Sequence, residues 1–223
     1  MALLDLSHVF SSYLCIGFVS SDLAHNIGAR RGYIAVEIPR LTMTNGYTIK
    51  SPESEAEVSG MWRLNHAVFA EEYPQHPAEP DGCLIDKFHG KNIYRIAWDG
   101  QDVLGMISAH WRPPFSAVAK FGNTVERLLI DGKTAEIRLL ALRKEVRGTS
   151  LAVQLAVSLM AELQRLGMEL LVISGISVQV RFYRHVGFEV VGEPVSENGI
   201  VFYPMIGRLE EILSRKDVIE RYA

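Results

Sequence analysis

The stretch that decides the fold reads Ala135-Glu-Ile-Arg-Leu-Leu-Ala-Leu-Arg-Lys-Glu-Val-Arg-Gly-Thr-Ser150. Residues 135–142 are rich in β-formers and predict a strand, and a basic loop follows them. Leucines recur every four residues after the loop and Gly167 can cap the end, which predicts a helix from about Thr149 to Leu166. A helix N-terminus beside basic side chains suits a phosphate group, whereas an ordinary strand-to-helix turn is the alternative.

Working outward, the upstream sequence predicts a strand over 47–50, a helix and a β-hairpin. Ser51 as N-cap, Pro52 as the first helical residue and an apolar period of about 3.6 predict a helix that runs to about Glu72. Strands are expected over 93–97 and 103–109, joined by a turn. The long connection 113–134 is interpreted as a flap over a site.

The downstream sequence predicts a strand over 169–174, a short helix over 178–186 and two closing strands, 188–191 and 200–205. This order indicates a mixed α/β fold with a mostly antiparallel sheet and at least one parallel crossover. We divide the chain into an N-terminal extension (1–44), one domain (45–206) and an amphipathic C-terminal helix (207–223).

Composition excludes several classes of protein. The 223 residues are 48% hydrophobic and 22% charged, as in soluble globular domains. The longest apolar run falls short of the roughly 20 residues that span a bilayer, and the net charge of −3 argues against nonspecific nucleic-acid binding. Two cysteines and seven histidines show no ligand spacing, so we expect a cytoplasmic protein with no metal and no disulfide framework.

Charge is unevenly distributed along the chain. Residues 51–102 hold ten acidic and four basic side chains, whereas residues 112–147 hold eight basic and four acidic ones. This asymmetry predicts a cationic ligand on one side of the molecule and an anionic ligand on the other, and solvated faces of either sign are the alternative.

A second motif, Val180-Arg-Phe-Tyr-Arg-His-Val-Gly-Phe188, follows the strand–loop–helix unit of residues 135–166. Together they resemble motifs A and B of the GNAT superfamily of acyl-CoA-dependent N-acyltransferases. The resemblance implies a central, mostly antiparallel sheet with a splayed parallel pair and flanking helices. Glu145 stands where the family usually has Gln or Arg, so Arg143 and Arg147 would supply the charge instead. The implied donor-binding residues are Leu142, Arg143, Arg147, Gly148, Thr149 and Ser150.

The segments 63–72, 81–88 and 135–138 also resemble the layout of acyl-homoserine-lactone synthases and N-acyl amino acid synthases. That resemblance implies acetyl-CoA, a long-chain acyl-CoA or acyl carrier protein as donor. Leu84 and His89 stand where the lactone synthases carry acids, which favours an amino acid or another small amine as acceptor. The implied acceptor-binding residues are Arg63, Phe69, Asp86 and Arg138.

Two residues are candidates for catalysis. Tyr183 would protonate the departing thiolate, or it is a packing aromatic; Glu136 would remove a proton from the ammonium acceptor, or it is a buried acid paired with Arg138 or Arg63. A backbone N–H near Leu142 would polarise the thioester carbonyl. The candidate walls of a pocket for the acyl tail, each of which could equally be core, are Met106, Ile107, Phe115, Leu139 and Leu140.

The sequence therefore predicts an N-acyltransferase that acts on a small amine and forms no covalent enzyme intermediate. A GNAT-like module that binds an acyl thioester or small metabolite without turnover is the alternative, since a fold does not prove activity. Acyl carrier protein and a second copy of the chain are the macromolecular partners left open.

Overall fold

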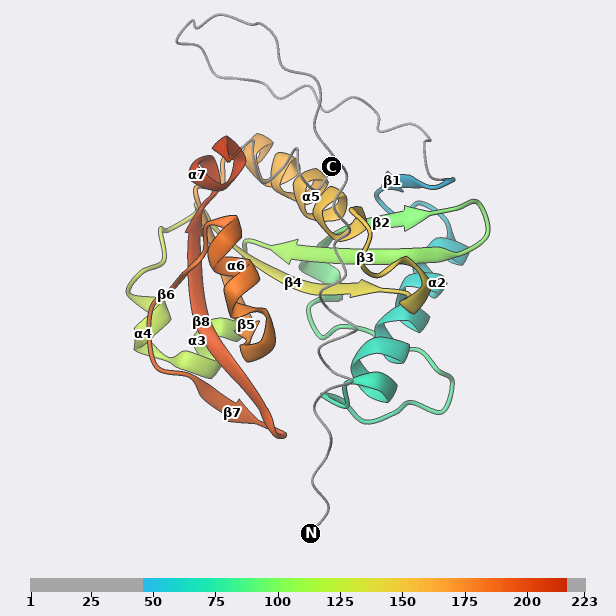
Figure 1. Cartoon of the computed structure of the whole chain (residues 1–223), viewed down its shortest axis with the longest axis horizontal. Helices are drawn as coiled ribbons and strands as arrows, with labels where there is room; N and C mark the ends of the chain where they lie inside the picture. Colours follow the sequence, from blue (N-terminus) through green and yellow to red (C-terminus); the bar gives the residue numbers. More distant parts are fainter. Residues whose placement is uncertain (1–45, 216–223) are drawn as a thin grey trace, which may run out of the picture.

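A single eight-stranded sheet organises residues 46–215, which the computed structural model of the chain describes. Its order is β1-β2-β3-β4-β5-β8-β6, and β7 pairs with β8; only β4 and β5 run parallel (Figure 1). The strands are β1 Thr48–Lys50, β2 Ile93–Trp98, β3 Val103–His110, β4 Thr134–Leu142, β5 Leu170–Ile176, β6 Glu189–Val190, β7 Val195–Glu197 and β8 Ile200–Arg208.

Helices cover both faces of this sheet. In Figure 1, α5 and α6 lie on one face, and α2, α3 and α4 lie on the other. The helices are α2 Glu55–His66, the π-helix η1 Ala67–Glu72, α3 Ser116–Phe121, α4 Asn123–Glu126, α5 Leu151–Arg165, α6 Val180–Val186 and α7 Leu209–Ser214. Three short 3-10 turns are η2 His89–Lys91, η3 Lys144–Val146 and η4 Ser177–Gln179.

Helix α5 confirms the prediction from leucine spacing. Its leucines face the sheet and are fully buried with Ile107 and Ala109 of β3, and Gly167 ends the helix at a φ of 77°. The predicted hairpin is also confirmed, because β2 pairs antiparallel with β3. The four leucines are Leu151, Leu155, Leu159 and Leu163.

The prediction that Ser51 caps the first helix is wrong. Ser54 is the N-cap: its Oγ accepts the Glu57 N–H at 3.3 Å, and the Glu57 carboxylate accepts the Ser54 N–H at 3.2 Å. This reciprocal capping box satisfies two amides that Ser51 and Pro52 could not. The helical path does reach Glu72 as predicted, but residues 67–72 widen into the π-helix η1.

The connection 113–134, interpreted as a flap over a site, is helical rather than an irregular loop, and its Ser116 and Ala117 contact Glu136. It folds into α3 and α4, which pack on β5 through the fully buried Ala117, Val125 and Val172. The sequence prediction also missed β7, which forms a hairpin with β8 around Asn198-Gly199. Asn-Gly is a strong signal for a two-residue turn, so this hairpin could have been found.

Strand β4 carries the irregularity that shapes the centre of the sheet. Leu139 has a φ of 55°, and the register with β3 shifts at this point, which marks a β-bulge. The parallel pairing of β4 with β5 joins only residues 134–136 to 170–172, so the two strands diverge beyond Glu136. The splayed pair expected from the GNAT resemblance is therefore present.

The predicted acyl-tail walls do not form one pocket. Met106 and Ile107 are 1% and 2% exposed, and they belong to the cores on opposite faces of the sheet. Leu139 packs with the α2-side core and Leu140 with the α5-side core, so the bulge separates them as well. Met106 and Ile107 are core residues because both are buried. They lie in different cores because neighbouring side chains of a strand point to opposite faces.

The described part of the predicted C-terminal helix is α7, which begins at Leu209 because β8 continues to Arg208. Leu209 and Ile212 are buried, as its apolar spacing predicts. Residues 1–45, which include the predicted extension 1–44, and residues 216–223 lie outside the described part. No helix within residues 46–215 is long and apolar enough to cross a membrane.

Candidate active site

A polar strip crosses the face of the sheet that carries α2 and α3. Ser108 and His110 of β3 lie directly opposite Arg138 and Glu136 of β4. Residues between them, such as Ala109, point to the other face and join the α5-side core. Polar side chains at these four positions interrupt an otherwise apolar surface, which marks the strip as a candidate for binding or chemistry.

Glu136 is only 1% exposed, yet its carboxylate is richly paired. It accepts the backbone N–H groups of Ser116 at 2.8 Å and Ala117 at 2.7 Å, and it lies 3.1 Å from His110 Nε2. Burial alone would raise the pKa of Glu136, but the contacts with His110, the two amides and Arg138 outweigh it and lower the pKa. The side chain is therefore an ionised carboxylate whose acceptor positions are occupied.

Arg138 and Asp86, both predicted to bind the acceptor, lie together in this site. Arg138 Nη2 donates to Asp86 Oδ2 at 2.7 Å, Nη1 donates to Ser116 Oγ, and the guanidinium lies 4.8 Å from the Phe88 ring centre. Arg138 Nε is buried and has no partner among residues 46–215. An unpartnered buried donor beside two fixed ones suits a bound acid.

The other two predicted acceptor residues do not join this site. Arg63 of α2 is exposed and its side chain has no partner within the described residues. Phe69 of η1 packs into the α2-side core. The alternative pairing of Glu136 with Arg63 is thus not formed, whereas Arg138 Nη1 lies 3.8 Å from Glu136.

Sequence reasoning missed a group of polar residues beside Asp86. Asn92 Nδ2 donates to Asp86 Oδ1 at 2.9 Å and to the Tyr94 hydroxyl at 3.0 Å, and His89 Nδ1 lies 3.0 Å from the same hydroxyl. Burial raises the pKa of Tyr94 to about 12. Trp62 Nε1 and Asn92 Oδ1 are buried without partners in the described part of the chain. Asn92 and Tyr94 alternate with apolar residues at the start of β2, and this alternation was the signal that could have found them.

The predicted phosphate loop is braced by acidic residues from other elements. Arg147 donates to both carboxylate oxygens of Glu72, at 2.5 and 2.8 Å, and Arg143 Nη2 lies 2.7 Å from Asp102. The Arg147 guanidinium lowers the pKa of Glu72 despite partial burial. Both cations predicted to bind phosphates therefore carry protein partners, and Lys144 Nζ, whose side chain is 72% exposed, lies 3.9 Å from the Glu72 carboxylate.

The rest of this loop is held by its own polar side chains. Gly148 adopts a φ of 76°. Thr149 Oγ1 donates to the Val146 carbonyl and accepts the Leu151 N–H, and Ser150 Oγ accepts from Gln154. These contacts hold the start of α5, and the predicted role of these residues in binding the donor stays a prediction.

The backbone of Leu142 is oriented by two neighbours. Arg143 N–H donates to the Leu104 carbonyl of β3 at 2.8 Å. In an antiparallel pair, alternate residues direct their N–H and C=O to opposite sides of the strand, so Leu142 turns its own away from β3. Arg147 Nε donates to the Leu142 carbonyl at 3.2 Å. From this alternation we expect the Leu142 N–H to face the side from which β5 has diverged.

Tyr183 of α6 lies against the opposite face of the sheet from Glu136. Its ring packs over Gly175 of β5, where an added Cβ would lie 3.1 Å from Tyr183 Cδ2. The ring centres of Tyr183 and Phe188 are 6.3 Å apart. Burial raises the pKa of Tyr183 to about 12. Its hydroxyl has no hydrogen-bond partner among residues 46–215.

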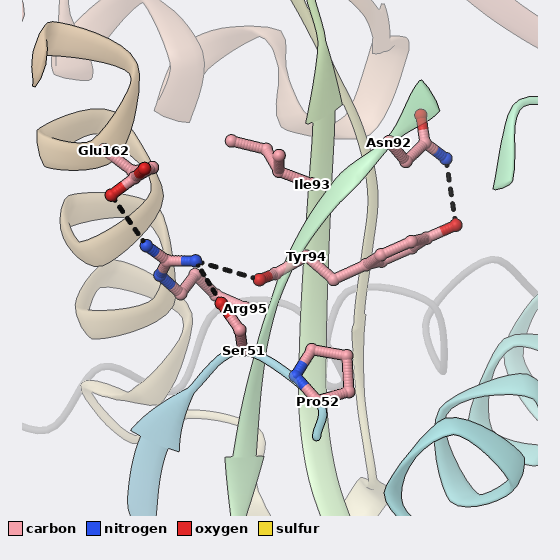
Figure 2. A pocket seen from close by; sticks show the side chains of 7 residues that line it. All are labelled: Ser51, Pro52, Asn92, Ile93, Tyr94, Arg95 and Glu162. Carbon is pink, nitrogen blue, oxygen red and sulfur yellow. Dashed lines mark hydrogen bonds and ion pairs between the residues drawn. The ribbon is translucent and has the colours of Figure 1, made fainter. Parts of the chain in front are cut away.

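Figure 2 shows a hollow at the edge of the sheet, where β2 runs past the end of β1. Its volume is about 370 Å³, and Asn92 and Tyr94 from the group beside Asp86 also line it. Arg95 there already pairs with Glu162 at 3.2 Å and donates to Ser51 Oγ. None of the residues implied by the family motifs lines this hollow. Within the described ranges, no cluster of His, Cys, Asp and Glu could hold a metal ion.

Comparisons with known proteins agree with the motifs. Residues 121–209 match the family model described as an acetyltransferase (GNAT) domain. No curated protein sequence matches the chain. Among solved structures, the CoA-dependent acyl-homoserine lactone synthase BjaI has a TM-score of 0.67 at 18% identity and covers 79% of this chain and 90% of its own.

Two further structures extend the likeness. The synthase LasI has a TM-score of 0.60 at 16% identity over 73% of this chain and 89% of its own. FeeM, an N-acyl amino acid synthase from uncultured soil microbes, has a TM-score of 0.61 at 15% identity over 76% of this chain and 95% of its own. Residues 121–209 thus match a GNAT acetyltransferase domain, and the chain has the fold of the acyl-homoserine lactone and N-acyl amino acid synthases.

Proposed function

We propose that this protein transfers an acyl group from a CoA or acyl-carrier-protein thioester to the amine of a small acceptor that also carries an acidic group, such as an amino acid. The observation that carries this proposal is the divergence of β4 from β5 beyond Glu136, into which strand alternation would direct the Leu142 N–H. A thioester carbonyl lying there would accept this N–H, which stabilises the oxyanion that forms during attack.

The donor's phosphates would lie at the N-terminus of α5. Arg143 and Arg147 are occupied by Asp102 and Glu72, so their role is to hold the loop in shape. Exposed Lys144 and the first amides of α5 would supply the positive potential for an anion. The related synthase BjaI has been solved with isopentyl-CoA, which supports a CoA thioester here.

The acceptor would lie along the polar strip. Asp86 could hold its ammonium group, and the unpartnered Arg138 Nε and Trp62 Nε1 could donate to its carboxylate. His89 and Leu84 replace acids that a cationic sulfonium substrate would favour. These substitutions support an amino acid over S-adenosylmethionine as acceptor.

The chemistry would be direct attack. The acceptor nitrogen bonds to the thioester carbonyl, the C–S bond breaks, and Tyr183 gives its phenolic proton to the departing thiolate. Its raised pKa keeps this proton in place at neutral pH. Glu136 as the general base stays a prediction: it is ionised, as a base must be, but a proton could reach it only if one of its present donors moved.

Thiol release tests the proposal. The full chain is incubated with CoA or acyl-carrier-protein thioesters, with and without a mixture of amino acids, and free thiol is measured. We expect release that depends on both substrates. No release with any pair would reject the enzyme.

The acidic partners of Arg143 and Arg147 favour one alternative, a module that senses the thioester without turning it over. Calorimetric titration with acyl-CoA separates the two functions. Tight binding of acyl-CoA together with no thiol release would establish the sensor.

A further inference from the structure

Three cations surround the ring of Phe88, beside the polar strip. Lys91 Nζ lies 4.0 Å from the ring centre, the Arg138 guanidinium carbon lies 4.8 Å from it, and Lys87 Nζ lies 5.0 Å from it. A significant contact between a cation and an aromatic face occurs only about once in 70–80 residues, so three on one ring are not a matter of chance. The ring therefore brings positive charges together where the acceptor is proposed to lie.

Lys91 shows what the ring compensates. Its Nζ donates to the carbonyl oxygens of Arg112 and Pro114, both at 2.6 Å, and no carboxylate within residues 46–215 lies at ion-pair distance from it. Partial burial and the neighbouring cations lower the pKa of Lys91, although nearby carboxylates act in the opposite direction. The negative face of an aromatic ring attracts a cation in such surroundings.

Phe88 is itself held by the backbone and by a second ring. Its N–H donates to Asp86 Oδ1 at 2.9 Å, and its carbonyl accepts the Lys91 N–H at 2.9 Å. The ring centres of Phe88 and His110 are 4.9 Å apart and their planes meet at 67°, an edge-to-face contact. The ring is thus a fixed surface for the Arg138 guanidinium.

A ring suits Arg138 in a way that a further acid would not. Nη1 already donates to the Ser116 hydroxyl and Nη2 to Asp86, and Nε has no partner in the described part of the chain. Another carboxylate would take up N–H donors and neutralise the charge. An aromatic face attracts the guanidinium as a whole and accepts none of its in-plane hydrogen bonds. Both the charge and Nε therefore stay available to a ligand.

We infer that Phe88 is a positioning residue: its ring holds the Arg138 guanidinium, with Nε unoccupied, where the acidic group of the acceptor would bind. Lys91 joins the same ring to the carbonyls of the 112–114 turn. The inference deepens the proposed function and rests on it for the acceptor alone. The contact between ring and guanidinium belongs to the folded chain, so it can be tested without substrate.

Urea unfolding of the full chain at pH 7 tests the contact in a double-mutant cycle. Phe88→Leu keeps an apolar side chain but no ring, and Arg138→Met keeps the stem without the charge. We expect Phe88→Leu to change the unfolding equilibrium constant about 5- to 30-fold more when Arg138 is present than in Arg138→Met. Equal effects in the two backgrounds would overturn the inference.

Fluorination separates the charge of the ring face from its packing. Trifluorophenylalanine at position 88 keeps the shape of the ring but removes most of the negative charge of its face, so it should show the same coupling to Arg138. The matched control is Phe202 of β8, whose ring centre lies 3.4 Å from Lys120 Nζ. Fluorination there should show no coupling to Arg138. Absence of coupling at position 88 would overturn the inference even if Phe88→Leu does not fold.

Kinetics then connect the ring to the acceptor. With trifluorophenylalanine at position 88, the KM for the acceptor should rise about 5- to 30-fold, with kcat and the KM for the donor nearly unchanged. The same change at Phe202 should alter neither KM. An unchanged KM for the acceptor, or an equal rise of both KM values, would overturn the role at the acceptor. Absent turnover in the wild type would reject the proposed function and leave the unfolding cycle to decide the inference.

Discussion

At the scale of single residues, the two proposed catalytic elements differ in how the protein holds them. The peptide that joins Leu142 to Arg143 is held by β3 and by Arg147, so the backbone beside the Leu142 N–H is a fixed part of the fold. The Tyr183 hydroxyl has no partner among residues 46–215, and only the packing of its ring positions it. A substitution at Tyr183 should therefore change kcat, whereas a substitution at Arg147 should change the free energy of unfolding.

Tyr183→Phe should lower kcat about 10²- to 10⁴-fold with little change in either KM, because the proton moves only as the C–S bond breaks. The free energy of unfolding should hardly change, since the ring is retained. Because the pKa of Tyr183 is raised to about 12, loss of its proton should not limit kcat below about pH 10. Full kcat in the variant, when chemistry is rate-limiting, would make Tyr183 a packing residue.

Arg147→Ala should lower the free energy of unfolding by about 1.5–3 kcal/mol at pH 7, because it removes both hydrogen bonds to the Glu72 carboxylate and leaves only the more distant Lys144 beside it. The pKa of Glu72 is lower in the folded protein than its ordinary value of 4.5, so this stabilisation is complete above that value. It is lost as the pH falls through the folded pKa. Urea unfolding of both proteins from pH 7 to pH 3 measures the difference.

Arg143→Ala is the matched control. Arg143 and Asp102 are 40% and 48% exposed, so their ion pair should contribute less than about 1 kcal/mol. Equal destabilisation by the two alanine variants would contradict the bracing role of Arg147. The KM for the donor should rise more in Arg147→Ala as well, since Arg147 holds the Leu142 carbonyl and the loop together.

At the scale of elements, α5 packs very closely against β3 and the last residue of β4, Leu142. A Cβ on Gly105 of β3 would lie 2.6 Å from Leu142 Cδ2 and 2.9 Å from Leu155 Cδ1. These contacts join β3, β4 and α5 at one point, so the position of Leu142 depends on the absence of a side chain there.

Gly105→Ala should destabilise the protein by about 1–3 kcal/mol, because both leucines would have to move. The melting temperature should fall by about 2–12 °C for a chain of this size. Gly90→Ala serves as the control, since its Cβ would meet no atom within 4 Å. Equal melting temperatures for the two variants would show that the close approach does not constrain the fold.

Elements that form from local periodicity could be predicted from the sequence, and those decided by distant contacts could not. The leucine spacing of α5 and the alternation of the hairpin identified both correctly. The N-cap depended on whether Ser51 or Ser54 found a reciprocal partner, and Glu57 settled it. The helices of the 113–134 connection form against β5, a contact the local sequence does not encode.

The same limit applies to the candidate site. The motifs identified Glu136, Asp86 and Arg138, and the structure brings these three together. Arg147 was expected to bind phosphate because it lies in a basic loop before a helix. Its partner Glu72 lies 75 residues away in the sequence, so the ion pair could not be predicted locally. The contact of His110 with Glu136 was missed because it follows from the β3–β4 register, which places the two residues opposite each other.

At the scale of the whole molecule, the sheet divides the proposed reaction between its two faces. The acceptor strip lies on the α2 side and Tyr183 on the α6 side, and β4 and β5 diverge between them. A donor would have to lie in this divergence to meet both groups. The bulge at Leu139 places Leu139 and Leu140 on either side of that path.

The preference for acyl length should follow from this arrangement. Each buried methylene contributes about 0.8 kcal/mol, so four extra carbons should raise kcat/KM by roughly two orders of magnitude before a plateau. Leu140→Ala should change this dependence, whereas Met106→Ala, in the core, should only lower stability. A series from acetyl to dodecanoyl that peaks at acetyl would reject the long-chain donor.

The central claim is acyl transfer from a thioester to an amine, and a labelled acyl group tests it most directly. The wild-type protein is incubated with a thioester carrying ¹³C at its carbonyl and with a mixture of amino acids, and the products are identified by mass spectrometry. We expect the label in an amide, in a one-to-one ratio with free thiol, and much more slowly with Tyr183→Phe. Label found only in the free carboxylic acid, or only in unreacted thioester, would contradict the account.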